Sequence, residues 1–193
     1  MKKSVILAAL GLAVATVSSY AQQGFIAFDT YDAAGGAGIQ TVFGNGPSVG
    51  SGIGSTFTGE LLFSTTAIND SATTAGTASN PLTGGWTVAS TGTFNTGAAS
   101  AGYITGPNFT YASGGTFFFE IAAFNGASYG ASTYQGHSAS FQATLVTGTT
   151  LPNADQLDNL APFSVFQTVP EPTTMALGGL GLAALLVARR KKA

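Results

Sequence analysis

Basic residues occur only at the two ends of this chain, and this partition limits what its middle can fold into. The six Lys and Arg residues are Lys2, Lys3, Arg189, Arg190, Lys191 and Lys192. None lies between Gln22 and Pro172, whereas all eight Asp and Glu residues do, so that stretch has a formal charge of −8. We therefore expect no stabilising ion pairs there, only apolar burial and hydrogen bonds. Binding of nucleic acid is excluded, because it needs Lys and Arg on phosphates.

The middle segment, residues 22–168, has the pattern of an all-β domain. Short apolar or alternating runs are separated by Gly, Asn, Ser, Thr and Pro clusters, which predicts strands at residues 24–30, 38–43, 56–64, 85–93, 101–105, 115–124, 139–147 and 163–168. Phe117 to Ile121 is apolar on both faces and predicts a central strand. This favours an antiparallel β-sandwich or jelly-roll passenger, with a barrel second. Residues 66–84 have little apolar content and are expected to be an exposed loop.

The N-terminus has the order of a cleavable secretion signal. Two lysines precede an apolar run from Val5 to Val17, and Ser19 and Ala21 supply the small residues that signal peptidase accepts. We place the signal peptide, an apolar helix, at residues 1–21, with cleavage between Ala21 and Gln22. The segment predicts Sec-type export and signal peptidase as partners.

The C-terminus, residues 169–193, carries Pro170-Glu171-Pro172, an apolar run from Met175 to Ala188, and four adjacent cations. The 14 apolar residues give roughly 21 Å of helix against a bilayer core of about 30 Å. A transmembrane helix over about 173–188 becomes long enough when its flanking threonines and snorkelling arginines are included. Arg189, Arg190, Lys191 and Lys192 then anchor that end in the cytoplasm, with the passenger outside.

Together these residues resemble the sorting tail of PEP-CTERM proteins, which combines this tripeptide, a short glycine-containing span and a terminal basic cluster. The resemblance implies that Pro170, Glu171 and Pro172 are recognised by exosortase, a membrane enzyme of Gram-negative bacteria that make exopolysaccharide. The chain is then expected to pass through an inner-membrane intermediate before reaching the cell surface or the extracellular space. The two prolines keep this segment extended, as a protease cleft requires.

Signals for catalysis in the passenger are weak, and we expect no enzyme activity. Gly126-Ala127-Ser128-Tyr129-Gly130 matches a nucleophile elbow, but residues 131–138 look like a loop rather than the required helix, and His137 precedes Asp155, against the usual order. Glu60 and Glu120 lie in predicted strands and leave glycoside hydrolysis as a remote alternative.

Binding sites are equally weakly indicated. The chain has no Cys and a single His, so a zinc site is not expected and His137 is placed on the surface. Asp29 with Asp32, or Asp155 with Asp158, are weak candidates for calcium ligands. Trp86 is the weak candidate for a carbohydrate-binding platform, with Tyr103, Tyr111, Tyr129 and Tyr134 as aromatic companions.

The sequence thus favours a noncatalytic surface or matrix protein, sorted by exosortase, without cofactor, and associated with the envelope or its exopolysaccharide. A carbohydrate-binding module on the same anchor is the alternative.

Overall fold

The computed structural model describes residues 23–31, 38–75, 80–147 and 157–168, which is most of the expected passenger. The predicted cleavage site at Ala21 and Gln22, the Pro-Glu-Pro tripeptide at 170–172, the helix at 173–188 and the basic tail at 189–192 lie outside the described residues. So do Asp32 and Asp155.

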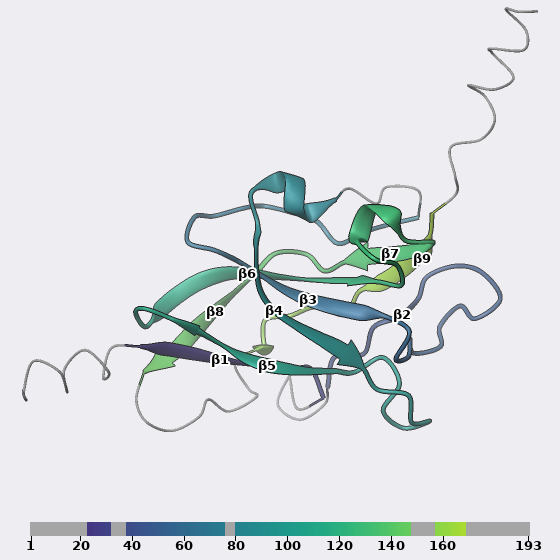
Figure 1. Ribbon diagram of the computed structural model, residues 1–193, viewed down its shortest axis with the longest axis horizontal. Helices are drawn as coiled ribbons and strands as arrows, with labels where there is room; N and C mark the ends of the chain where they lie inside the picture. The colour runs from purple at the N-terminus through teal and green to yellow at the C-terminus, as the bar shows by residue number, and fades with distance from the viewer. Residues whose placement is uncertain (1–22, 32–37, 76–79, 148–156, 169–193) are drawn as a thin grey trace, which may run out of the picture.

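The described chain is built of strands, with two short 3-10 helices (Figure 1). In chain order the elements are β1 (Gly24–Asp29), β2 (Val42–Phe43), β3 (Thr58–Ser64), η1 (Pro81–Gly84), β4 (Thr87–Phe94), β5 (Ile104–Tyr111), β6 (Gly115–Phe124), η2 (Tyr129–Ala131), β7 (Tyr134–His137), β8 (Phe141–Thr147) and β9 (Ser164–Gln167). The all-β prediction is confirmed.

Most expected strands are found where the sequence places them. β6 has the predicted bounds, and β1, β3, β4, β8 and β9 differ by at most two residues at either end. The expected strand at 38–43 shrinks to β2, and the one at 101–105 is displaced into β5. β7 was not predicted, and it lies in the segment that looked like a loop.

The prediction misplaced β5 because this strand contains Gly106 and Pro107, which weaken the sequence pattern of a strand. The structure accommodates them at an irregularity in pairing with β1. Ile26 pairs with Phe109 and Phe28 with Gly106, so two residues of β5 lie opposite the single residue Ala27. Such a bulge tolerates a proline, because the extra residues do not donate to the ladder.

The strands form one continuous sheet in the order β2-β9-β7-β6-β3-β4-β5-β1-β8, and β8 also pairs with β6. This last pairing closes six strands, β6-β3-β4-β5-β1-β8, into an antiparallel ring. β7, β9 and β2 extend from the other half of β6, and among the strands of the described ranges only β2 and β9 run parallel to each other.

The closed ring is a correction to the sandwich or jelly roll that the sequence favoured, and it corresponds to the barrel ranked second. The physical reason lies in β6, whose ten residues exchange partners along their length. Its first half pairs with β8, from Gly115 to Phe119, and its last three residues pair with β7. Because β8 then reaches β1 as well, the ring leaves none of its six strands as an open edge.

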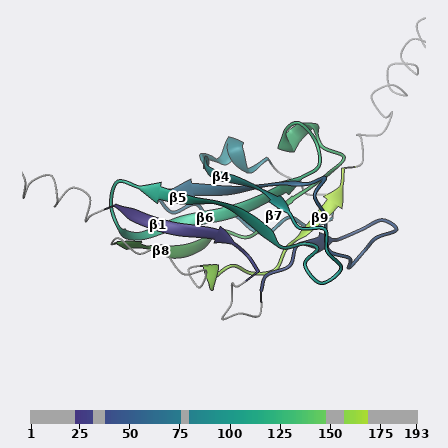
Figure 2. The same cartoon turned by 60° about the horizontal axis from the view of Figure 1, so that its bottom comes forward.

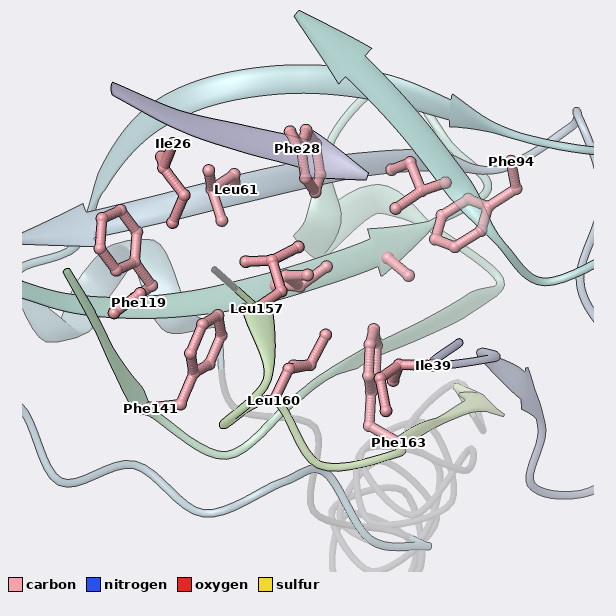
Figure 3. Packing of buried hydrophobic residues seen from close by; sticks show 14 of the residues in the cluster. Ile26, Phe28, Ile39, Leu61, Phe94, Phe119, Phe141, Leu157, Leu160 and Phe163 are labelled. Carbon is pink, nitrogen blue, oxygen red and sulfur yellow. The ribbon is translucent and has the colours of Figure 1, made fainter. Parts of the chain in front are cut away.

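The main core fills the interior of this ring. Ile26, Phe28, Leu61 and Phe119 project into it from β1, β3 and β6, as Figure 3 shows. Leu157, Leu160 and Phe163 join them from the chain leading to β9 (Figure 3). Alternate residues of β3 and β6 therefore face inward, as a half-buried sheet requires.

β3 and β6 are also covered on their outer face. Leu62, Trp86, Ala122, Phe124 and Tyr129 form a second apolar cluster there. Figures 1 and 2 show η1 and η2 on one side of the sheet. Every residue of β6 from Phe119 to Phe124 is buried, which confirms the predicted central strand. The exposed-loop prediction for 66–84 is wrong in part, because Thr73 and Pro81 are buried in this layer.

Candidate functional site

A buried acid and the single histidine meet beneath this outer layer. β6 places Glu120 opposite Leu62 of β3, and Ala122 opposite His137 of β7. Because side chains alternate along a strand, Glu120, Ala122 and His137 project from the same face. Glu120 and His137 are thus diagonal neighbours on adjacent strands.

The two side chains are in direct contact. Nδ1 of His137 lies 3.0 Å from Oε1 of Glu120, and their side chains are only 1% and 0% exposed. The contact corrects the expected surface position of His137. It is an ion pair when His137 is protonated, and it thus also corrects the expectation of a passenger without ion pairs. The sequence offered little signal for it, because Tyr-Gln-Gly-His has no apolar alternation.

Asp70 completes the cluster from the segment that covers the sheet. Its carboxylate and the ligand-bearing atoms of Glu120 and His137 all lie within 4.8 Å of one another. Asp70 is half-buried, so it forms the outer side of the cluster. No pattern in the sequence connects these three residues, which come from separate parts of the chain.

Backbone hydrogen bonds fix the covering segment beside β7. The amide of Thr73 donates to the carbonyl of His137 at 3.0 Å, and the amide of His137 donates to Oγ1 of Thr73 at 2.8 Å. Three residues away, the amide of Ser140 donates to the carbonyl of Asp70 at 3.0 Å, and the Asp70 amide donates to Oγ of Ser140 at 3.2 Å. Residues 70–73 are therefore held along residues 137–140.

The hydrogen-bonding capacity of Glu120 is poorly used. Neither carboxylate oxygen accepts a well-directed hydrogen bond from the described residues. Nδ1 of His137 lies 3.0 Å from the carbonyl oxygen of Ser138 as well, and this contact has hydrogen-bond geometry. Since Nδ1 carries at most one proton, it cannot serve both oxygens well. A buried carboxylate in this position is costly without further compensation.

Burial and mutual charge shift the pKa values of Glu120, His137 and Tyr129. Desolvation raises the pKa of Glu120, and the close contact with His137 and its charge oppose this only partly. Desolvation lowers the pKa of His137, but the contact with Glu120, the Ser138 carbonyl and the charge of Asp70 outweigh it, so the net shift is upward. Burial also raises the pKa of Tyr129 to about 12. These shifts indicate a low-dielectric site with excess negative charge.

Glu60 lies on the same face but outside this cluster. It is opposite Ala122 in the β3–β6 ladder and therefore diagonal to Glu120. Desolvation raises its pKa as well. The two glutamates considered for glycoside hydrolysis thus share a face, but Glu120 is fully buried and does not meet solvent.

The aromatic platform proposed around Trp86 is not formed, which corrects that prediction. Trp86 is 5% exposed and Tyr129 is 1% exposed, both within the second apolar cluster. Tyr134 packs edge-on against Phe43 in the main core, and Tyr111 lies beside Phe63. Tyr103 contacts Tyr31 instead. Core packing accounts for these side chains, so they do not present one sugar-stacking surface.

Three other weak candidates from the sequence, Asp29, Asp158 and Ser128, lie in the described residues. Oδ1 of Asp29 accepts a hydrogen bond from the amide of Tyr31 at 2.8 Å, which is a turn contact. Asp158 is exposed on the chain that follows the undescribed residues 148–156. Ser128 precedes only the three residues of η2, not the helix that a nucleophile elbow requires.

Within the ranges that the structure describes, no helix has the length and apolar character needed to cross a membrane. Searches of curated proteins and of solved structures returned no match.

A comparison with family models matches residues 168–192 to the PEP-CTERM protein-sorting motif. This confirms the resemblance drawn from Pro170, Glu171 and Pro172, from the apolar run and from the basic end. The chain therefore carries a PEP-CTERM protein-sorting motif, which indicates an exported protein that exosortase sorts through a membrane-anchored precursor.

Proposed function

We propose that the passenger is a noncatalytic component of the cell surface or extracellular matrix, associated with the envelope or its exopolysaccharide. The observation that carries this proposal is the sorting motif at residues 168–192, directly behind the last strand. A protein delivered this way acts where it meets the polymers outside the cell.

The junction between domain and motif is short. β9 ends at Gln167, and Thr168 is still attached to the domain, because its amide donates to the carbonyl of Thr133 at 2.8 Å and its hydroxyl donates to the carbonyl of Ser132 at 2.9 Å. Four residues, 169–172, separate Thr168 from Thr173, so the five residue-to-residue steps span at most about 17 Å. The folded passenger is thus kept close to the membrane until processing releases it.

The outer face of β4 and β5 supports an association with polysaccharide. Alternate residues there are exposed threonines, including Thr91, Thr93, Thr105 and Thr110. Thr93 and Thr105 are directly opposite in the ladder. A face of hydroxyl groups without fixed cations offers both donors and acceptors to sugar hydroxyls.

Sorting is tested by the mass of the surface protein in hosts with and without exosortase. We expect the mature form to lack the basic tail only when the enzyme is present and Pro170, Glu171 and Pro172 are intact. A triple alanine variant of these residues should keep the tail in both hosts. If the wild-type protein keeps its tail in both hosts, exosortase processing is wrong.

Association with polysaccharide is tested by fractionating cells that make or lack exopolysaccharide. We expect the protein in the matrix fraction of the first and in the medium of the second. Replacing Thr91, Thr93 and Thr105 by Val keeps shape and strand propensity but removes the hydroxyls, so it should also shift protein to the medium. The control carries Thr65→Val and Thr96→Val, two exposed threonines outside β4 and β5. Equal retention in both strains would refute the association.

A further inference from the structure

We propose that Asp70, Glu120 and His137 bind one divalent transition-metal ion, such as Zn²⁺. The ion would fasten residues 70–73, the segment that covers the sheet, to β6 and β7. The three residues supply two carboxylates and one imidazole, and their ligand atoms already lie within 4.8 Å of one another. They come from β6, from β7 and from the segment that begins at Asp70, so a shared ion would join three parts of the fold.

The spacing of the donor atoms suits such an ion. Zn²⁺ binds imidazole nitrogen and carboxylate oxygen at about 2.0–2.2 Å, which places two ligand atoms of a tetrahedral site about 3.4 Å apart. The distance between Nδ1 of His137 and Oε1 of Glu120 is 3.0 Å. The two atoms are therefore close to the separation that a shared ion needs, and the imidazole ring would turn Nδ1 from the Ser138 carbonyl towards the ion.

The lack of well-directed hydrogen bonds from the described residues to the Glu120 carboxylate indicates a ligand independently of the clustering. Its side chain is fully buried, and neither oxygen accepts a well-directed hydrogen bond from the described residues. The ladder aims this carboxylate at His137, and Asp70 approaches from the covering segment. Metal coordination is a normal way for a buried carboxylate to be compensated.

The charge balance favours a divalent ion over a proton. With His137 protonated and both acids ionised, the cluster carries −1. With His137 neutral and a divalent ion bound, the charge is zero, which is the cheaper state in a low-dielectric interior. Metal binding would release the proton from Nδ1, which would give up its hydrogen bond to the Ser138 carbonyl and bind the ion instead.

The donor set also selects the class of metal. Imidazole nitrogen combined with carboxylate oxygen suits Zn²⁺ and its first-row neighbours, whereas Ca²⁺ requires six to eight oxygen ligands. Because Glu120 and His137 are buried and only Asp70 is partly exposed, the ion would have a structural role. It would fasten residues 70–73 to residues 137–140, where backbone hydrogen bonds already hold them.

The test uses the full chain, purified in detergent through a tag without histidine and treated with chelator. Because the chain has a single histidine, the imidazole ¹⁵N spectrum contains one ring, that of His137. After Zn²⁺ is added back and the excess is removed, we expect one Zn²⁺ per chain by elemental analysis, and during the titration a shift of the Nδ1 resonance that saturates at one equivalent. A melting temperature that rises with Zn²⁺ and not with Ca²⁺ should accompany it.

Asp70→Asn and Glu120→Gln should each weaken Zn²⁺ binding at least tenfold, whereas the exposed-acid control Asp158→Asn should bind as the wild type does. Asp70 is half-buried, so Asp70→Asn is the variant that best preserves the fold, and circular dichroism checks both. If Glu120→Gln does not fold, the wild-type histidine spectrum still decides. An Nδ1 resonance that does not move with Zn²⁺, or binding that survives in a folded Asp70→Asn variant, would overturn the proposal.

Discussion

Replacing Phe63 by Ala should destabilise the passenger by about 3–5 kcal/mol, the range for removing a buried phenylalanine. Phe63 lies on β3 inside the ring and is 8% exposed. Its ring centroid lies 4.9 Å from that of Phe109, 4.8 Å from Tyr111, 5.4 Å from Phe117 and 5.6 Å from Phe119. These partners come from β5 and β6, so the residue joins strands across the barrel.

The magnitude follows from two contributions. Loss of the buried ring costs about 3 kcal/mol in transfer free energy, and the cavity among four rigid rings cannot fully collapse, which adds to it. Aromatic pairs contribute about 0.5–1.5 kcal/mol each beyond area, although not additively. Against a total stability of about 5–15 kcal/mol, the variant would retain only part of its stability.

The assay is urea unfolding of the full chain in detergent, followed by the fluorescence of Trp86, the single tryptophan. Trp86 is 5% exposed, so unfolding should shift its emission to the red. Phe63→Leu keeps most of the volume and should cost less than Phe63→Ala. Val146→Ala, at a residue 43% exposed, is the surface control and should change stability by less than about 0.5 kcal/mol. A loss below about 1.5 kcal/mol in Phe63→Ala, with an unchanged urea dependence, would refute the packing argument.

Two further substitutions probe the strands around the candidate site. Gly136→Ala should destabilise the β7–β9 pairing, because its Cβ would meet the Ser164 carbonyl oxygen and lie 3.0 Å from Cα of Val165, both backbone atoms; an unchanged melting temperature would contradict this. Glu60→Gln should raise the melting temperature at neutral pH and leave it unchanged below about pH 4. Burial raises the pKa of Glu60, so the neutral carboxyl is favoured on folding and its stabilising effect is lost as pH rises through the folded-state pKa. Melts recorded across that range test the sign, and a Glu60→Gln variant less stable at neutral pH would be the opposite result.

Most strands could be predicted because the signal for a strand is the pattern of apolar and polar residues close together in the sequence. The short apolar or alternating runs of β1, β3 and β8 and the doubly apolar β6 place these strands within two residues of their observed bounds. β5 and β7 were harder to predict. β5 contains Gly106 and Pro107, and β7 has only four residues, without apolar alternation. Which strands pair with one another depends on contacts between distant parts of the chain, so the closed ring could be seen only in the structure.

The sequence by itself determined the export and sorting of this protein. The sorting motif is a contiguous segment, and its tripeptide, apolar run and basic end can be recognised without knowledge of the fold. Only the tertiary structure brought Asp70, Glu120 and His137 together. Their proximity depends on the β6–β7 register and on residues 70–73 lying along 137–140, both contacts between distant parts of the chain. A one-residue shift of β6 would turn Glu120 into the apolar core, and a one-residue shift of β7 would turn His137 away from Glu120. The chemistry of the site therefore rests on long-range pairing, whereas that of the tail rests on local sequence.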